Sequence, residues 1–279
     1  MTLSKSLVGT SNLVTQIPVP EIAVPEYTKD SPDAEGNYYG AGTGVQGGHF
    51  DGRYYYQAFV KYCYNDSETY ADYHYVNNAK NIVKIVKYDM FARKVVAVSE
   101  DMDTLNHAND ITYNSKTNQI VVCNNTGGYK ILSFLNADTL AFIEAKTLTV
   151  NLYAIEYNAK TDQYILGIAG SDQFAIADSD FDNISTYRGG TANVTDYTKQ
   201  NICSDDNYVY CLYYGGKEVA DTDRIIVYDW NGNLVTDIEV NFDTQEPENI
   251  SVVDGALFVG TGKSDKAYFY NISKLTTAE

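Results

Sequence analysis

The segment that decides the fold is LVTQIPVP at residues 13–20, because LVTDIEVN at residues 234–241 repeats its pattern near the other end of the chain. Leu, Val, Thr, Ile and Val stand at matching places, and an Asn precedes each copy. The second copy lies in a series of short strand-like segments, whereas the first stands alone. A lone strand that matches the outer strand of a repeat is what a closed ring of repeats needs. We therefore expect residues 13–19 to complete the last repeat of a ring.

From Gln46 onward the sequence reads as repeating units of four short strands, here named a to d in chain order. First strands begin at 46, 109, 153, 201 and 249, so most units are 44 to 48 residues long. YNSKTNQ at 113–119 echoes YNAKTDQ at 157–163, and Asp-Gly pairs at 51–52 and 254–255 suit tight hairpins. This period is typical of propeller blades. The prediction is an all-β, single-domain, five-bladed β-propeller closed by an N-terminal strand, with blades at 46–99, 107–147, 151–190, 199–241 and 248–274.

Charge and hydropathy exclude several classes of partner. Lys and Arg number 20 against 37 Asp and Glu, a net charge of −17, so nucleic acid and anionic membrane surfaces would repel the chain. No apolar run is long enough to span a membrane. Residues 1–14 lack the apolar core of a signal peptide, so none is expected within this sequence. An acidic, ring-closed module suits an extracellular or virion-surface location.

The four cysteines do not predict a metal site. None is spaced as CxxC, and no His is close in sequence to any of them, so we expect no zinc. Four buried free thiols are the prediction, with a Cys203–Cys211 bridge between neighbouring strands as the alternative.

The candidate site is the central channel of the propeller. Innermost strands line this channel, and the d-to-a and b-to-c loops open on one face, where such folds usually bind ligands. Aligning the units on their a–b turns gives one equivalent ring of residues: Gln46, Asn109, Tyr153, Asn201 and Asn249. Three interpretations stay open. The ring binds a polar ligand; it holds a hard cation such as Ca²⁺, with charge from Glu248 or Asp110; or its amides bond each other and water to plug the channel.

One histidine raises a catalytic alternative. His107 stands just before the second inner strand, where a channel mouth is expected, and with Asp110 or Glu248 it forms a candidate acid–base set. No nucleophile motif accompanies it.

Tyrosine is unusually abundant, with 26 residues, and several lie in expected b–c loops. The insertion at 62–80, YCYNDSETYADYHYVNNAK, carries Tyr70 and Tyr73, and other loops carry Tyr129 and Tyr214. Tyr rings offer stacking area at low entropy cost, which suits recognition of sugars or a protein surface. The alternative is that the insertion folds over the propeller and buries its rings.

Two stretches resemble a known enzyme family. VQGGHFDGRYY at 45–55 looks like the opening of glutaminyl cyclotransferases, and NISVVDGALF at 249–258 is similar to one of their later blades. Only Gln46 carries over, and the Trp-rich pocket of that family is missing because Trp230 is the single Trp. The repeat length is also similar to that of tachylectin-like lectins.

These observations favour a non-catalytic propeller that binds carbohydrate or a partner surface, without a cofactor. The alternative is a cyclotransferase- or lyase-like enzyme that uses His107 and Glu248.

Overall fold

A computed structural model describes residues 6–7, 12–65, 81–124, 130–216, 222–242, 245–263 and 266–273. Regular structure in these ranges is almost entirely β-strand. Within these ranges no helix has the length and hydropathy needed to cross a membrane.

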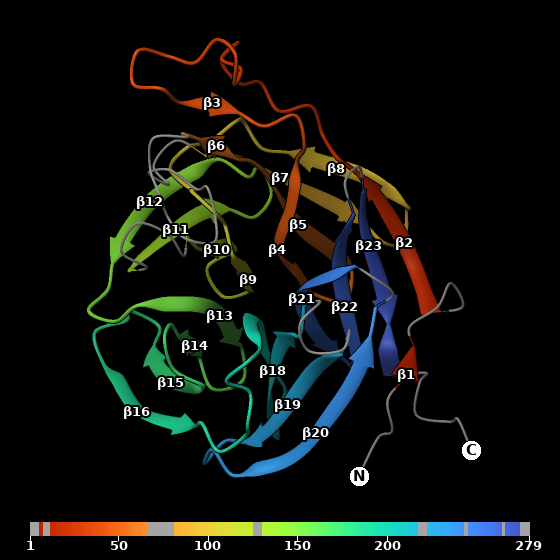
Figure 1. Cartoon of the computed structure of the whole chain (residues 1–279). Coiled ribbons are helices and arrows are strands. Elements are labelled where there is room, and N and C mark those ends of the chain that lie inside the picture. The colour runs from red at the N-terminus through yellow and green to blue at the C-terminus, as the bar shows by residue number, and fades with distance from the viewer. Residues whose placement is uncertain are drawn as a thin grey trace.

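Five sheets stand in a ring around a central axis (Figure 1). Blade 1 contains β4 (Gly44–Phe50), β5 (Tyr54–Lys61), β7 (Ile82–Asp89) and β8 (Lys94–Val98). Blade 2 contains β9 (Asp110–Asn114), β10 (Gln119–Cys123), β11 (Ile131–Asn136) and β12 (Phe142–Thr147). Blade 3 contains β13 (Leu152–Asn158), β14 (Gln163–Ile168), β15 (Gln173–Asp178) and β16 (Ile184–Gly189). Blade 4 contains β17 (Thr198–Ser204), β18 (Tyr208–Tyr214), β19 (Asp223–Asp229) and β20 (Leu234–Asn241). Blade 5 contains β21 (Glu246–Val253), β22 (Ala256–Lys263), β23 (Lys266–Asn271) and β2 (Leu13–Pro18). The fold is a five-bladed β-propeller, as predicted.

The N-terminal strand closes the ring, which confirms the prediction drawn from the repeated LVT segments. β2 pairs antiparallel with β23 as the outer strand of blade 5, with Ile17 opposite Ala267. Ile17 is fully buried, whereas Val14 on the same strand is 44% exposed. A second N-terminal strand, β1 (Ser6–Leu7), runs parallel to β20 at the edge of blade 4. The chain therefore begins by covering the edges of its last two blades.

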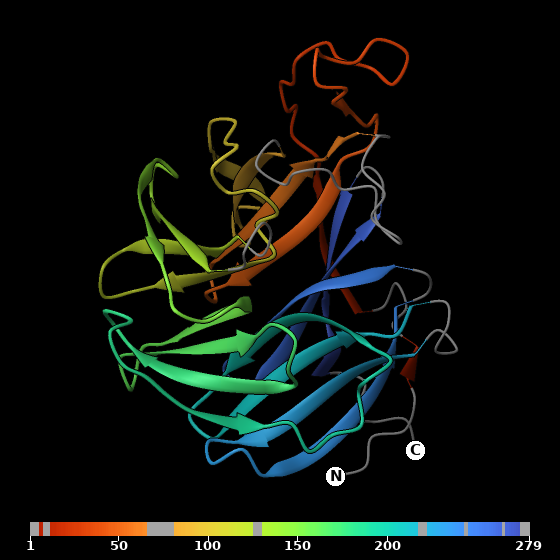
Figure 2. The same ribbon diagram turned by 60° about the vertical axis from the view of Figure 1, so that its left-hand side comes forward.

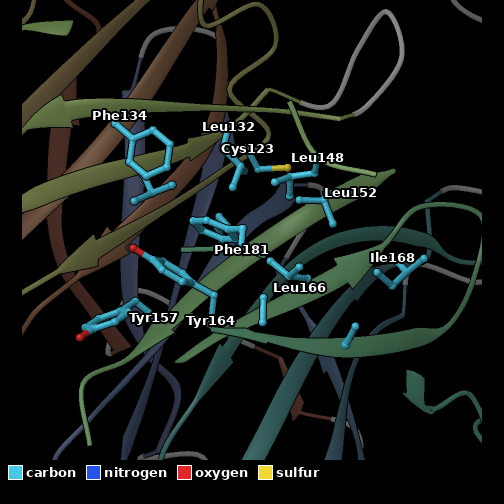
Figure 3. Close-up of a cluster of buried hydrophobic side chains, with 14 residues drawn as sticks. Cys123, Leu132, Phe134, Leu148, Leu152, Tyr157, Tyr164, Leu166, Ile168 and Phe181 are labelled. Atoms are coloured by element: carbon cyan, nitrogen blue, oxygen red, sulfur yellow. The ribbon is translucent and has the colours of Figure 1, made fainter. Parts of the chain in front are cut away.

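Apolar side chains fill the space between neighbouring blades. Five buried clusters occur, one for each pair of adjacent blades. Figure 3 shows the cluster between blades 2 and 3, where Phe181 lies between Phe134 and Tyr164. The ring centroids of Tyr164 and Phe181 are 4.4 Å apart. Alternating strands thus present one apolar face to each neighbour, so the ring is held together blade by blade.

The connection before blade 1 does not form a sixth blade. It contributes β3 (Tyr38–Tyr39), which pairs with β6 (Cys63–Tyr64) in a small sheet that projects beyond the propeller (Figure 2). The rings of Tyr38 and Tyr64 stack at 5.6 Å. All four cysteines are buried free thiols, which confirms that prediction.

Candidate functional site

The innermost strands β4, β9, β13, β17 and β21 form a closed ring, because each contacts the next. We call the end of the channel with the b–c and d–a connections the loop end, and the end with the a–b and c–d turns the turn end. Each inner strand runs from the loop end to the turn end.

A β-bulge near the loop end changes the predicted ring of equivalent residues. In blades 3, 4 and 5 the register shifts at Tyr153, Gln200 and Glu248, and in blade 1 it shifts around Gln46. Asn109 directly precedes β9 at the same level. The alignment of the repeats predicted Asn201 and Asn249 at this level. In the structure they lie one residue closer to the turn end, and Gln200 and Glu248 take their places, because each bulge holds an extra residue that the repeat spacing does not reveal.

Asp110, Asn201 and Asn249 tie the inner strands together. Asp110 accepts hydrogen bonds from the Ile155 N–H at 2.8 Å and from the Asn201 side chain across the channel. Asn201 accepts a bond from the Ile250 N–H at 3.1 Å. Asn249 is fully buried and accepts the Tyr55 hydroxyl at 2.9 Å. These three side chains therefore connect the inner strands of different blades, and the Asp110–Asn201 bridge crosses the channel between its two ends.

Four buried polar residues share this level at the loop end, and we call them the polar ring: Gln46, Asn109, Gln200 and Glu248. The side chain of Tyr153 at the same level packs in the apolar cluster between blades 3 and 4. The amide nitrogens of the polar ring have protein partners. Asn109 Nδ2 donates to the carbonyl oxygen of Tyr153 at 2.6 Å, and Gln46 Nε2 donates to the Tyr62 hydroxyl at 3.0 Å. Burial raises the pKa of the Glu248 carboxyl well above its usual range, and the nearby Glu246 adds to the shift.

No ion pair joins His107 to Asp110 or Glu248, both of which lie in the described part of the chain. The His107 ring lies 5.8 Å from the Tyr62 ring, and its backbone N–H donates to the Asn124 carbonyl oxygen at 3.3 Å. Burial lowers the pKa of His107 to about 4. The imidazole is therefore neutral at pH 7. A catalytic role for His107, Glu248 or Asp110 stays a prediction.

Of the tyrosines predicted to bind ligand, Tyr70, Tyr73 and Tyr129 lie outside the described residues. Tyr214 is half-buried at the loop end of β18. At the start of the insertion, Tyr62 and Tyr64 pack against each other with ring centroids 6.5 Å apart, and their rings lie against Gly44 and Gly40. Residues 66–80 of the insertion lie outside the described residues, so ligand binding and the packed flap both stay predictions.

The clearest concavity lies at the turn end, which the sequence did not predict. It is an open depression of about 640 Å³, and all five blades contribute to its lining. Tyr54 and Tyr113 line it together with Val252 and Val253. Tyr157 also belongs to the lining, but it is only 5% exposed and its ring packs against Tyr164. Lys160 and Asp206 form a salt bridge of 2.6 Å at the turns of blades 3 and 4.

The floor of the depression is polar. His49 Nδ1 of blade 1 lies 3.5 Å from Glu156 Oε2 of blade 3, so the pair spans the channel past blade 2. Thr112 donates to the same carboxylate oxygen at 2.9 Å. Beside them the buried hydroxyl of Ser204 has no hydrogen-bond partner among the described residues. A buried polar atom without a partner calls for an explanation, and a ligand or water that reaches the floor would supply one.

The rim carries acidic groups that are already oriented by their turns. Asp51 Oδ1 accepts the N–H groups of Arg53 and Tyr54 at 2.8 and 2.6 Å, and Oδ2 has no hydrogen bond within the described part of the chain. His49, Glu156 and Ser204 were not among the site residues predicted from the sequence. The sequence offered only one signal, a polar residue near the end of each inner strand. His49 and Glu156 are 107 positions apart, and nothing in the sequence indicates that they are in contact.

Comparison with known proteins adds no family. No protein-family model matches the sequence, and no curated protein matches it. Among solved structures, hydrazine synthase from Kuenenia stuttgartiensis is 12% identical, with a TM-score of 0.41 over 65% of this chain and 52% of that chain. The chain thus spans about half the length of that relative. A member of the duf4221 family from Bacteroides vulgatus is 11% identical, with a TM-score of 0.46 over 92% and 96% of the two chains. Neither likeness carries an argument about function.

Proposed function

We propose that this protein is a non-catalytic, carbohydrate-binding propeller whose ligand occupies the turn-end depression. The observation that carries the proposal is that one 640 Å³ depression is lined both by the partly exposed tyrosines Tyr54 and Tyr113 and by polar groups of its floor. Sugars need both, since their C–H faces pack on rings while their hydroxyls need donors and acceptors at fixed positions.

Unused polar atoms at the floor and rim favour a ligand rich in hydroxyl groups. Ser204 Oγ can both donate and accept, Asp51 Oδ2 can accept, and the second carboxylate oxygen of Glu156 has no protein donor within the described ranges. A phosphorylated or otherwise anionic ligand is disfavoured by the net charge of −17. A neutral glycan fits both the charge and the hydrogen-bonding groups, and it suits a module exposed at a cell or virion surface.

A glycan array followed by calorimetric titration of the best neutral oligosaccharide tests the proposal. Two variants address the site without disturbing the fold. Ser204→Ala removes a hydroxyl that has no partner in the described structure, and Asp51→Asn keeps the oxygen that accepts the turn N–H groups. Loss of one ligand hydrogen bond of about 1 kcal/mol weakens the Kd roughly fivefold.

The matched control is Ser179→Ala, which removes an exposed hydroxyl from the c–d turn of blade 3, outside the depression. We expect the control to bind like the wild type, and all three variants to melt within a few degrees of it. A protein that binds no glycan on the array, or binds one equally well in both site variants, contradicts the proposal.

A further inference from the structure

We propose that the buried polar ring at the loop end of the channel is a binding site for a hard divalent cation, with Ca²⁺ as the best fit. This site lies beyond the Asp110–Asn201 bridge from the proposed glycan site, so the two proposals stand on different residues.

The ring residues share one level of the inner strands. In blades 2 to 5 the level is set by a shared register: the residue that follows the position at this level pairs with the fifth residue of the second strand of the blade. These positions are Asn109, Tyr153, Gln200 and Glu248. In blade 1, Gln46 lies in the bulge opposite the fifth residue of β5. Asn109 Nδ2 also lies 3.2 Å from the carbonyl oxygen of Gln200, which belongs to a blade that is not its neighbour. The side chain of Asn109 therefore extends across the axis, and the channel is narrow at this level.

The amide groups of the ring are oriented with their oxygens unused. Asn109 Nδ2 must be the nitrogen, because both of its partners are backbone carbonyl oxygens, which only accept. Gln200 Nε2 donates to Glu246 Oε1 at 2.7 Å. Gln46 Nε2 bonds the Tyr62 hydroxyl. No hydrogen bond to the side-chain oxygen of Gln46, Asn109 or Gln200 occurs among the residues that the structure describes.

Glu248 supplies the charge. Its side chain is only 6% exposed, and no donor to its carboxylate is found in the described part of the chain. A buried carboxylate without a donor is costly unless it is protonated or paired with a cation. With two oxygens from Glu248 and one from each of three amides, the ring offers five oxygens. Ca²⁺ takes about six to eight oxygen ligands in flexible geometry, and water completes such a shell. Mg²⁺ demands a stricter octahedron and fits this mixed ring less well.

Among the described residues, no three or more His, Cys, Asp or Glu side chains form a group that could hold a metal ion. That result is compatible with the proposal, because three of the four ligating side chains are amides.

Calcium binding is tested by calorimetric titration of the chelator-treated full chain with CaCl₂, beside a thermal melt with EDTA or with millimolar CaCl₂. We expect one saturable site, a higher Tm with Ca²⁺ and a smaller response to MgCl₂. Glu248→Gln removes the charge at nearly constant shape and should weaken the Kd for Ca²⁺ roughly tenfold or more, since affinity follows ligand charge. Glu144→Gln removes one carboxylate from the exposed outer strand β12 and should bind Ca²⁺ like the wild type.

Two results overturn the proposal: no heat and no change in Tm for the wild type at millimolar Ca²⁺, or an equal response in Glu248→Gln and the wild type. The second would show that Ca²⁺ binds only the acidic surface. If Glu248→Gln does not fold, luminescence of bound Tb³⁺ decides the question in the wild type. Excitation of tyrosine should sensitise it through Tyr62, whose hydroxyl accepts a hydrogen bond from Gln46 of the ring, and Ca²⁺ should displace it with one-site stoichiometry. Absence of a sensitised signal, or of displacement, overturns the proposal.

Discussion

Closure by the N-terminal strand can be tested at one side chain. Ile17 of β2 is 0% exposed and belongs to the apolar cluster between blades 5 and 1. Ile17→Ala removes three carbon atoms, which is about 2.4 kcal/mol at roughly 0.8 kcal/mol per buried methylene. The cavity left behind adds to this loss, so we expect a decrease of about 3 to 4 kcal/mol in the free energy of unfolding.

Val14→Ala on the same strand is the matched control. Val14 is 44% exposed, so its truncation should change the unfolding free energy by about 0.5 kcal/mol or less. Urea denaturation monitored by tyrosine fluorescence measures both variants, and the slope m should stay constant if both unfold as the wild type does. An Ile17→Ala protein that loses less than about 1 kcal/mol would mean that β2 is not an integral strand of blade 5.

Four further predictions concern the inner ring, the thiols and two buried titratable groups. A Cβ at Gly47 would collide with the backbone of Asp110 and lie 2.8 Å from the Ala108 carbonyl oxygen, so Gly47→Ala should lower the free energy of unfolding by about 3 kcal/mol or more. Gly42→Ala is the control and should be nearly neutral, because its Cβ meets no atom within 4 Å. Equal urea midpoints for the two variants would contradict this close approach. Burial raises the pKa of the Cys211 thiol to about 12, so thiol reagents should label Cys211 only after unfolding, and labelling of native protein at pH 8 would show that blade 4 opens. The pKa of His107 is lowered from 6.5 to about 4, so its contribution to stability is present above pH 6.5 and is lost as pH falls towards 4. His107→Gln should flatten that part of the profile of stability against pH. An unchanged profile would count against the burial of this imidazole. The raised pKa of Glu248 acts in the opposite direction, because the folded protein holds a proton that the unfolded chain releases above its ordinary pKa of 4.5. Stability is therefore lost as pH rises, and Glu248→Gln should reduce that loss in the absence of divalent cations. An equally steep loss in the variant would contradict the burial of an ionisable carboxyl at this position.

The architecture was readable from the sequence because its signals are local and repeat. Hairpin turns, alternating strands and a period of 44 to 48 residues fixed the blades, and the LVT echo identified Leu13–Pro18 as the closing strand. The position at the level of the ring was predicted correctly from the sequence only in blades 1 to 3, at Gln46, Asn109 and Tyr153. In blades 4 and 5 the position belongs to Gln200 and Glu248, because a bulge adds one residue without altering the repeat length.

The turn-end depression was not predictable for a different reason. Its floor joins His49 of blade 1 to Glu156 of blade 3 across the axis, and no sequence period relates residues of blades that are not neighbours. Fold analogy also directed attention to the loop end, where most of the tyrosines predicted to bind ligand lie outside the described residues. The depression itself depends on five turns meeting around one channel, which only the assembled ring shows.

A crystal structure of the protein with the best neutral oligosaccharide from the array tests the central claim most directly. We predict electron density for a sugar ring in the turn-end depression, packed on its two partly exposed tyrosines, with hydroxyl groups within hydrogen-bond distance of Ser204 Oγ and Asp51 Oδ2. Density for the glycan at the loop end, or on the outer strands with the depression holding only water, would contradict the account.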